Sequence, residues 1–370
     1  MTSAEPQPDG PLSPVSASAS RSASAQSSGA SPRPSTIQDV AREAGVSRAA
    51  VSKVIRNAYG VSDKMRAQVE EAIERLGYRP RVAARAMRGA SFTLGFEIPQ
   101  VGNDFLTMIV DGATEALAET PYQMIIAPLG RDQKSDVAIN SLADRQVDGI
   151  VAISPRVDPA WLERIAERTP VVMIGRHDRS DRYDTITGDD RSGAEQVMSH
   201  LVEQGHRRIT HLTIHPSRPE PPWAGQAGDE PHVVRTAVYR DRMQALGLEP
   251  SVIHTLFDGS EAHATTRKLL DSPEPPTAIF AGNDTLAIGV LSAIAEAGLD
   301  ERDVSVVGYD DIPIARHPLV SLTSVDQSGV LMGREAARLL LERLEGRTEA
   351  VQLQIAATLR ERRSSAPPRC

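Results

Sequence analysis

From residue 92 onward, short apolar runs alternate with amphipathic stretches, and this alternation restricts the fold of the chain more than any other feature. The apolar runs have the length of strands and lie at 94–98, 123–127, 149–153, 171–174, 209–214, 278–280 and 304–308. The stretches between them have helical spacing, for example at 105–118, 137–145, 192–203, 234–246, 285–297 and 330–344. Strands that alternate with helices form parallel sheets covered on both faces. Roughly 270 residues of this pattern are too many for one sheet, so we predict two α/β lobes.

Residues 36–76 carry a different pattern, which predicts three short helices. Apolar residues recur at helical spacing in each of them, as Ile37, Val40, Ala41 and Ala44 do in the first. Residues that can cap or end a helix stand at the expected places: Ser35 or Thr36, Ser47, Ser62 or Asp63, and Gly77.

The turn between the first two helices is that of a helix-turn-helix. Gly45 can take the left-handed conformation that such a turn needs, and the small side chains of Ala41 and Ala44 let the two helices cross closely. In this motif the second helix enters the major groove of DNA. An ordinary small helical domain is the alternative interpretation, because three amphipathic helices are common.

The distribution of charge favours the DNA-binding interpretation. The net charge of −8 by itself argues against a nucleic-acid partner. Between Thr36 and Arg88, however, there are eleven Lys and Arg and six Asp and Glu, a balance of +5, which leaves −13 for residues 89–370. A basic segment attached to an acidic body is expected where one small domain meets a polyanion.

Distinct motifs stand at intervals along residues 36–362. In the helical segment they are Thr36-Ile37-Gln38-Asp39-Val40-Ala41, Gly45-Val46-Ser47, Val51-Ser52-Lys53-Val54-Ile55 and Leu76-Gly77-Tyr78-Arg79-Pro80. Further along they are 103–105, 146–150, 205–209, 280–289 and 303–311. Together they resemble the motifs of the LacI/GalR family of bacterial transcription regulators. The resemblance implies an all-α helix-turn-helix headpiece followed by a sensor of two α/β lobes like those of periplasmic sugar-binding proteins.

The resemblance also implies the boundaries of the parts. We assign the headpiece to 35–79, a hinge helix to 80–90 and the effector-binding domain to 91–362. Within that domain, the first lobe comprises about 91–188 and 327–348, and the second about 189–323 and 349–362. Residues 1–34 are almost entirely Ser, Ala, Pro, Gly and Gln, and we expect them to be disordered, like the short tail at 363–370.

The family reads DNA bases with the first residues of its second helix. The matching residues are Arg48, Ala49 and Lys53, with Ala50 beside them; Arg and Lys can donate to guanine, and Ala can contact a thymine methyl. Positions that match contacts to the DNA backbone are Thr36, Ser47, Arg56 and Ser62. In the hinge, Arg81 replaces the family's usual Asn, which adds a phosphate contact but removes a helix cap. Met87 stands where the family inserts a Leu wedge into the minor groove.

The family holds its effector in the cleft at the carboxyl ends of the sensor strands. The matching residues here are Asn103 and Phe105 from the first lobe, Arg235, Phe257, Asn283 and Asp310 from the second, and Gln327 from the crossover. Carboxylate, amide and guanidinium groups with an aromatic ring suit a polyol. An Asn before a helix is often only an N-cap, and that alternative stays open for Asn283. Gly175 replaces the family's usual Asp, which leaves the identity of the effector open.

The sequence lacks the marks of two other classes of protein. An enzyme on the same α/β layers would be expected to carry a nucleotide-binding, zinc-protease or nucleophile-elbow motif, and none is found. His206, His211 and His215 do not suggest a metal site, so we expect no catalytic residue, metal or cofactor. A secreted solute-binding protein would begin with a signal peptide and would lack a basic headpiece.

The remaining expectations concern location and mechanism. A single cysteine, Cys370, and the absence of a signal peptide or a membrane-spanning window indicate a cytoplasmic protein. We expect a homodimer on a pseudo-palindromic double-stranded operator, with no membrane partner. A small-molecule effector would change allosterically whether the hinges can order on DNA, most often to control repression.

Overall fold

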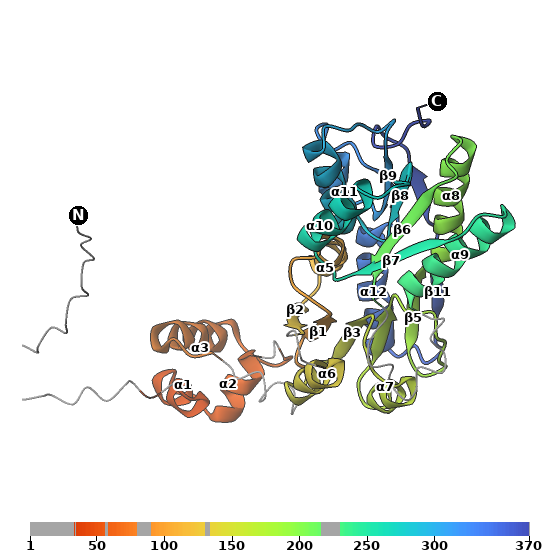
Figure 1. Ribbon diagram of the computed structural model, residues 1–370. Coiled ribbons are helices and arrows are strands. Elements are labelled where there is room, and N and C mark those ends of the chain that lie inside the picture. Colours follow the sequence, from red (N-terminus) through yellow and green to blue (C-terminus); the bar gives the residue numbers. More distant parts are fainter. Residues whose placement is uncertain are drawn as a thin grey trace, which may run out of the picture. The chain divides into compact units, whose positions relative to one another are not determined.

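The computed structural model describes residues 33, 35–55, 58–79, 90–129, 134–215 and 230–369 (Figure 1). The chain divides into two compact units, one up to Pro80 and one from Arg81 onward. The hinge up to residue 89, with Arg81 and Met87, lies outside the described residues, and so do Arg56 and residues 1–32.

The first unit, the headpiece, is the bundle of three helices that the sequence predicts: α1 (Ile37–Glu43), α2 (Arg48–Ile55) and α3 (Asp63–Leu76). Thr36 caps α1 in a capping box, in which the Asp39 carboxylate accepts a hydrogen bond from the Thr36 backbone N–H at 2.9 Å. Gly45 has a φ of +64°, the left-handed conformation expected for the turn. Val40, Val51 and other buried apolar side chains form the core.

The second unit, the sensor, contains two six-stranded sheets, each at the centre of a lobe (Figure 1). The first has the order β11-β5-β4-β3-β1-β2, and its strands are β1 (Thr93–Ile98), β2 (Gln123–Pro128), β3 (Gly149–Ile153), β4 (Val171–Ile174), β5 (Asp184–Gly188) and β11 (Gln352–Ile355). The second has the order β12-β10-β9-β8-β6-β7, and its strands are β6 (Ile209–Ile214), β7 (Ser251–Thr255), β8 (Ala278–Ala281), β9 (Ser305–Asp310), β10 (Thr323–Asp326) and β12 (Thr358–Arg360). Among these described strands, only β10 and β12 pair in an antiparallel way.

Helices cover both faces of each sheet, as expected for parallel strands. On the first sheet, α5 (Asp104–Leu117) and α12 (Gly329–Leu344) pack on one face, and α6 (Ser135–Asp144) and α7 (Pro159–Ala166) on the other. On the second, α8 (Asp190–Glu203) and α9 (Pro231–Ala245) lie opposite α10 (Gly259–Leu270) and α11 (Asp284–Glu296). A short 3₁₀ turn, η2 (Pro313–Arg316), follows β9. The α/β two-lobed sensor is therefore confirmed.

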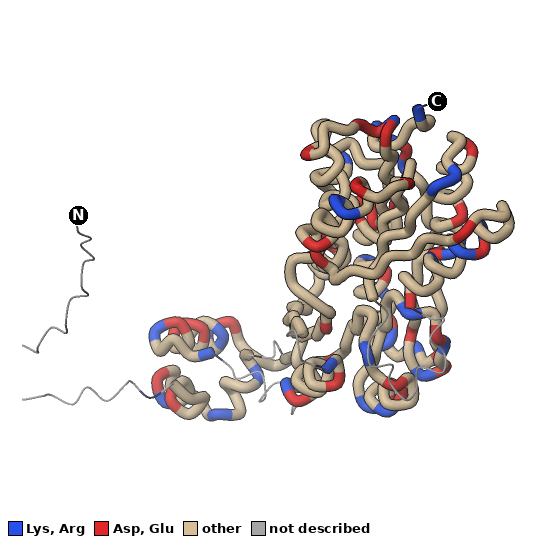
Figure 2. Tube along the Cα trace, viewed as in Figure 1, with Lys and Arg blue, Asp and Glu red and all other residues tan. Residues whose placement is uncertain are grey.

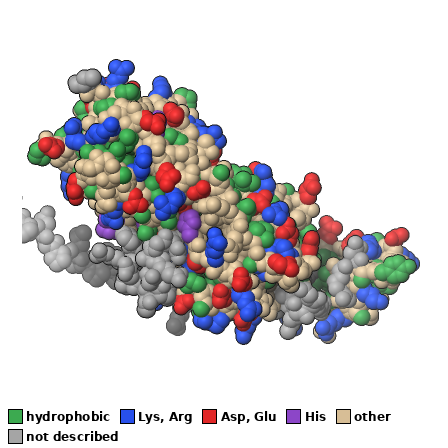
Figure 3. All heavy atoms as spheres, turned by 90° about the vertical axis from the view of Figure 1, so that its right-hand side faces the viewer, with side chains coloured by type: hydrophobic (Ala, Val, Ile, Leu, Met, Phe, Trp, Pro, Cys, Tyr) green, Lys and Arg blue, Asp and Glu red, His purple; other side chains and the backbone are tan. Residues whose placement is uncertain are grey.

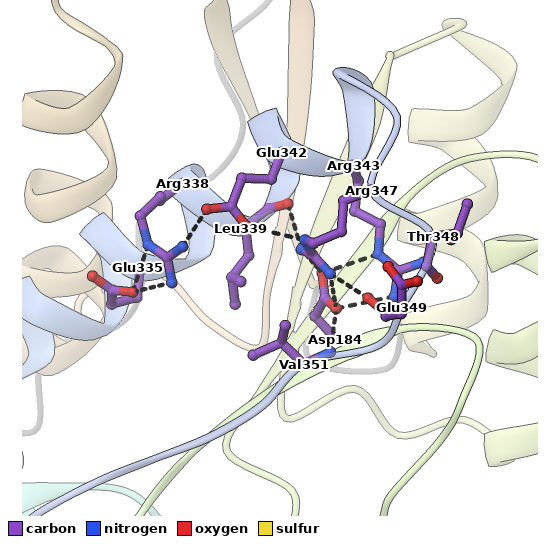
Figure 4. A network of polar contacts seen from close by, with 10 residues as sticks. All are labelled: Asp184, Glu335, Arg338, Leu339, Glu342, Arg343, Arg347, Thr348, Glu349 and Val351. Atoms are coloured by element: carbon purple, nitrogen blue, oxygen red, sulfur yellow. Dashed lines mark hydrogen bonds and ion pairs between the residues drawn. The ribbon is translucent and has the colours of Figure 1, made fainter.

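A buried ionic network ties the edge of the first sheet to α12 (Figure 4). Asp184 begins β5, and its side chain is fully buried. Its carboxylate accepts hydrogen bonds from Arg343 at 3.0 Å, from Arg347 at 2.8 Å and from the backbone N–H of Val351 at 2.8 Å. These bonds connect β5, the end of α12 and the start of β11.

That network accompanies a correction to the predicted lobes. We assigned all of 349–362 to the second lobe, and this is wrong for β11. Residues 352–355 pair in parallel with β5, in register Gln352 with Thr185, so they belong to the first sheet. The apolar side chain of Ile355 is buried in the core of that lobe. Only after β11 does the chain cross to β12 in the second sheet.

The prediction of a disordered tail at 363–370 is also wrong for residues 363–369. Ser364 and Ser365 are buried, and the backbone N–H of Val306 donates to the Ser364 carbonyl at 2.7 Å. The Ser305 hydroxyl donates to the Ala366 carbonyl at 2.9 Å. β10 begins opposite Val307, so the first two residues of β9 need other partners, and the tail supplies them.

No described helix is long and apolar enough to cross a membrane.

Candidate functional site

In the headpiece, the exposed side of α2 carries the predicted base readers. Arg48, Ala49 and Lys53 are exposed, while Val51 and Val54 of the same helix are buried in the headpiece core. Ala50 is half-buried. The helix therefore presents one polar, cationic side and one apolar side.

Basic and acidic residues both occur along the headpiece helices (Figure 2), and Arg48 and Lys53 differ from Arg42 and Arg75 in their ion pairing. Arg42 pairs with Asp39 at 3.2 Å, and Arg75 pairs with two glutamates at 2.6 Å each. Neither Arg48 nor Lys53 has an ion pair with any described residue. Their charges are thus available to a polyanion.

The three hydroxyls predicted to contact the DNA backbone all cap helices. Ser47 accepts from the backbone N–H of Ala50 at 3.1 Å, and Ser62 accepts from Met65 at 3.3 Å. Each serine hydroxyl can still donate its proton to a phosphate. Thr36 differs, because its hydroxyl donates to Asp39 at 2.6 Å. Its proton is therefore already committed within the headpiece.

In the sensor, a cavity of about 290 Å³ lies between the two lobes. All seven residues predicted to contact an effector line it: Asn103, Phe105, Arg235, Phe257, Asn283, Asp310 and Gln327. The cavity opens at the carboxyl ends of strands, since Ser154 follows β3, Gly175 follows β4 and Gly282 follows β8. Residues more than 200 positions apart in the sequence are thereby brought to one place.

The two cavity asparagines are both helix caps. Oδ1 of Asn103 accepts from the backbone N–H of Phe105 at 2.9 Å, and Oδ1 of Asn283 accepts from Leu286 at 2.9 Å. Capping occupies the carbonyl oxygen of each amide and leaves its NH₂ group as a donor. The two roles considered for Asn283 are therefore compatible.

Asp310 is the most perturbed carboxyl group of the cavity. It is 6% exposed, and Nε2 of Gln327 donates to its Oδ1 at 2.6 Å. Burial raises the pKa of Asp310 to about 7, although Arg235 and Gln327 act in the opposite direction. Its φ of +113° is rare for a residue with a side chain, and such strain is common at binding sites.

Arg235 is held in the cavity by three contacts. Its Nε donates to Asp190 at 2.7 Å, and one terminal nitrogen donates to the carbonyl of Gly282 at 2.8 Å. The guanidinium carbon lies 3.6 Å from the centre of the Tyr309 ring, a cation–π distance. The sequence did not indicate Asp190 as a cavity residue, because it follows β5, a strand that the apolar-run pattern missed.

The wall that the first lobe contributes is largely apolar. Ile109, Ile153, Ile174 and Met332 line it, near the two cavity phenylalanines. Arg176, which follows Gly175, is 7% exposed and donates to Asp178 at 2.6 Å and to two carbonyls of the 155–157 loop at 2.8 Å. Gly175 replaces the Asp that the family usually has here, so this wall of the cavity is apolar. The neighbouring Arg176 is already paired with Asp178.

The rim of the cavity adds residues that sequence reasoning did not find. Arg156 is exposed there, and Glu230 and His232 come from the start of α9. Burial lowers the pKa of His232 to about 4, and the positive charges of Arg235 and Arg156 add to this effect. His232 is therefore neutral at pH 7.

The three histidines considered for a metal site occupy separate settings. His206 bonds to Thr277 and to the carbonyl of Ala366, and His211 is fully buried against Phe280. His215 stacks on His254 with ring centres 5.3 Å apart. Among the described residues, no group of three or more His, Cys, Asp or Glu could hold a metal ion.

Comparisons with known proteins match both units. A model of the bacterial regulatory proteins of the lacI family matches residues 36–81, and a model of a periplasmic binding protein-like domain matches residues 198–365. The ribose operon repressor of Escherichia coli (strain K12) is 30% identical, and the match covers 89% of this chain and 99% of that protein. The chain belongs to the LacI family.

Solved structures of LacI-family proteins agree with the fold. A complex of the transcriptional regulator CelR with cellobiose is 32% identical with a TM-score of 0.62, and a lac repressor dimer bound to operator and the anti-inducer ONPF is 25% identical with a TM-score of 0.74. Each covers 90% of this chain and 100% of its own. As a LacI-family protein, the chain is a DNA-binding transcription regulator with a small-molecule sensor.

Proposed function

We propose that this LacI-family regulator is a homodimeric repressor in the bacterial cytoplasm, and that a small molecule bound in the sensor cavity controls its affinity for a specific operator. The observation that carries the proposal is the convergence of seven predicted residues, from Asn103 to Gln327, on one cavity. The ribose operon repressor and the cellobiose complex of CelR support control by a sugar or a related metabolite. The lac repressor dimer on its operator supports the assembly.

On the operator, Arg48, Ala49 and Lys53 read base edges, with Ala50 beside them. Their exposure on one side of α2 and their unpaired charges support this role. Ser47 and Ser62 donate to phosphates from the ends of helices. By similarity with the family, Arg56 and Arg81 add backbone contacts and Met87 enters the minor groove. The Thr36 hydroxyl already donates to Asp39, so Thr36 contributes to the interface by its position and not by a hydrogen bond from that hydroxyl.

In the cavity, the second lobe supplies most of the polar contacts, and the wall from the first lobe is largely apolar. Asp310 and Gln327 accept and donate to hydroxyls, Asn283 and Asn103 donate through their amides, and Phe105 and Phe257 cover an apolar ring face. This division fits an uncharged, hydroxyl-rich ring such as a sugar. We assign no catalytic role to the cavity, because its relatives are transcriptional regulators.

The test begins with thermal-shift screening of the full chain against neutral sugars, including d-ribose and cellobiose, and their corresponding acids. Operator fragments are selected from random duplex DNA, and their affinity is measured by fluorescence anisotropy with and without each hit. The proposal expects at least one neutral sugar or metabolite to change operator affinity by at least about fivefold. Failure to select any duplex would refute the DNA role, and hits that stabilise the chain but leave operator affinity unchanged would refute the control.

A further inference from the structure

The orientation of Arg235 is fixed by other residues of the chain. Its Nε and one terminal nitrogen are engaged by Asp190 and by the carbonyl of Gly282, and its plane lies over Tyr309. No described residue forms a hydrogen bond with the other terminal nitrogen, Nη2. A guanidinium with two of its three nitrogens fixed can present the third to a ligand in one direction only.

Asp190 is itself fixed by a second partner. It is 1% exposed, its Oδ1 accepts from Arg235, and its Oδ2 lies 2.9 Å from Nε2 of His177. Burial alone would raise the pKa of Asp190, but the Arg235 charge and the His177 hydrogen bond outweigh it and hold the pKa below its usual value. The carboxylate is therefore charged, and it cannot rotate without losing one of its two partners.

His177 and Asp190 lie at the carboxyl ends of two neighbouring strands of the first sheet. His177 follows β4, and its neighbours are anchored there, since Arg176 donates to two carbonyls of the 155–157 loop. Asp190 comes two residues after the end of β5, where the chain crosses to α8, which packs on the second sheet. Arg235 of α9 reaches this pair from the second lobe, so the bond between Asp190 and Arg235 joins the two walls of the cavity.

Stability alone does not account for this arrangement. Burying a charged pair costs desolvation that its attraction barely offsets, so apolar side chains of similar size could fill the space at no loss. What the charged pair adds is a fixed orientation of the Arg235 guanidinium. Its two fixed oxygens determine where the guanidinium points, and one of those bonds depends on the separation of the lobes.

We propose that Asp190 and His177 are positioning residues of the effector cavity, with Asp190 orienting Arg235 and His177 fixing Asp190 from the end of the neighbouring strand. The inference rests on the proposed function, because it assumes that Arg235 contacts the effector. It adds a direct link between occupancy of the cavity and the relative position of the lobes. A ligand that moves Arg235 must also move the bond that joins the two lobes.

The test measures the positioning itself, without a ligand. In the ¹⁵N-labelled full chain, the Nε–H signal of Arg235 is identified by its loss in Arg235→Lys, and its exchange with water is followed. His177→Ala should accelerate that exchange by at least about tenfold, because Asp190 loses the partner that fixes it. His177→Gln should restore most of the protection, because the glutamine amide can still donate to Asp190. Asp190→Asn should fall between His177→Ala and the native chain.

The matched control is His263→Ala. His263 also bonds to a carboxylate, Glu296, at 2.6 Å, but it joins α10 to α11 within one lobe and does not line the cavity. It should leave the Arg235 signal unchanged. Unchanged exchange in His177→Ala, equal acceleration in His263→Ala, or no rescue by His177→Gln would overturn the proposal.

A second measurement separates this inference from the proposed function. Calorimetric titration with d-ribose and with cellobiose should show about tenfold weaker binding to His177→Ala than to the native chain, and no change for His263→Ala. Equal affinities for His177→Ala and the native chain would overturn the positioning role. If neither sugar binds the native chain, the proposed effectors are wrong, while the exchange measurement still decides the role of His177.

Discussion

Replacement of Asp310 by Asn is expected to stabilise the chain, by an amount that grows as the pH rises. Asp310 is buried, and its pKa of about 7 in the folded chain compares with 3.8 for an ordinary aspartate. Between these pH values the unfolded chain releases the proton while the folded chain keeps it, so the free energy of unfolding falls as pH rises. The difference between the two pKa values corresponds to roughly 4 kcal/mol, which is the full cost of the charge above pH 8.

Asparagine avoids that cost. It cannot ionise, it still accepts from Gln327, and it tolerates a positive φ better than most residues. Asp310→Asn should therefore match the native chain near pH 4 and exceed its unfolding free energy by up to about 4 kcal/mol at pH 8. Urea unfolding of the full chain at several pH values, followed by tryptophan fluorescence, measures the difference.

Glu97 provides the matched control. It is fully buried in β1, burial raises its pKa to about 7, and it does not line the cavity. Glu97→Gln should show a similar pH-dependent gain in stability and leave effector binding intact. Asp310→Asn should lose at least about tenfold in effector affinity, because a carboxyl group that can accept through both oxygens is replaced by an amide with a single acceptor oxygen. A stability difference for Asp310→Asn that does not change between pH 5 and pH 8 would refute the pKa argument, and unchanged effector affinity would refute the role of Asp310 in the cavity.

Three further predictions concern other parts of the chain. Asp184→Asn should lower the unfolding free energy at pH 7 by roughly 3–5 kcal/mol, because it leaves two half-buried arginines without their fully buried carboxylate. Arg338→Ala removes exposed ion pairs on α12 and should change it by less than about 1 kcal/mol in urea unfolding. Gly333→Ala should cost about 1–3 kcal/mol in the same assay, because a Cβ there would collide with the backbone of α5; an unchanged midpoint would contradict this close contact. Arg48→Ala should relax operator specificity at one base pair of each half-site by about 1–3 kcal/mol, whereas Arg56→Ala should weaken all duplexes alike; equal losses on specific and random DNA for Arg48→Ala would exclude it as a base reader.

One strand that the sequence patterns missed, β5, is fully buried although most of its side chains are not apolar. All five residues of β5 are buried, yet the strand reads Asp184-Thr-Ile-Thr-Gly. A charged residue can begin a buried strand here because two arginines from the end of α12, far along the chain, neutralise it. No local pattern contains that information. Asp190 was not predicted for the same reason, because a residue can be expected at the carboxyl end of a strand only once the strand itself is recognised.

The C-terminal residues were misjudged for a related reason. Ser364, Ser365 and the prolines after them have the composition of a disordered tail, since few apolar groups are available to bury. The structure orders them through hydrogen bonds instead, because the first residues of β9 extend past β10 and need partners. Composition measures what a segment can bury and does not reveal which backbone groups elsewhere lack a partner.

The cavity residues were predicted from the resemblance to the LacI/GalR family, and for two of them the local sequence carries a signal as well. Asn103 and Asn283 each begin the helix that follows a strand, so a capping signal in the sequence also marks the cavity edge. Capping and ligand binding are often treated as competing explanations for such residues. Here the cap engages the carbonyl oxygen and leaves the amide nitrogen free to donate, so one side chain can serve both purposes.

The charges around the cavity follow a pattern that bears on its ligand. Arg235 pairs with Asp190, and Arg176 pairs with Asp178, so the buried cations are neutralised by the chain itself. Asp310, the remaining buried carboxyl group of the lining, has a pKa near neutrality, and an uncharged Asp310 hydrogen-bonds without adding net charge. A charged ligand inside the cavity, away from Arg156 at its exposed rim, would have to disrupt one of these pairs or lose its hydration without a counter-charge, whereas a neutral polyol meets donors and acceptors already in place. The electrostatics of this LacI-family sensor therefore favour neutral, hydroxyl-rich effectors over their acids.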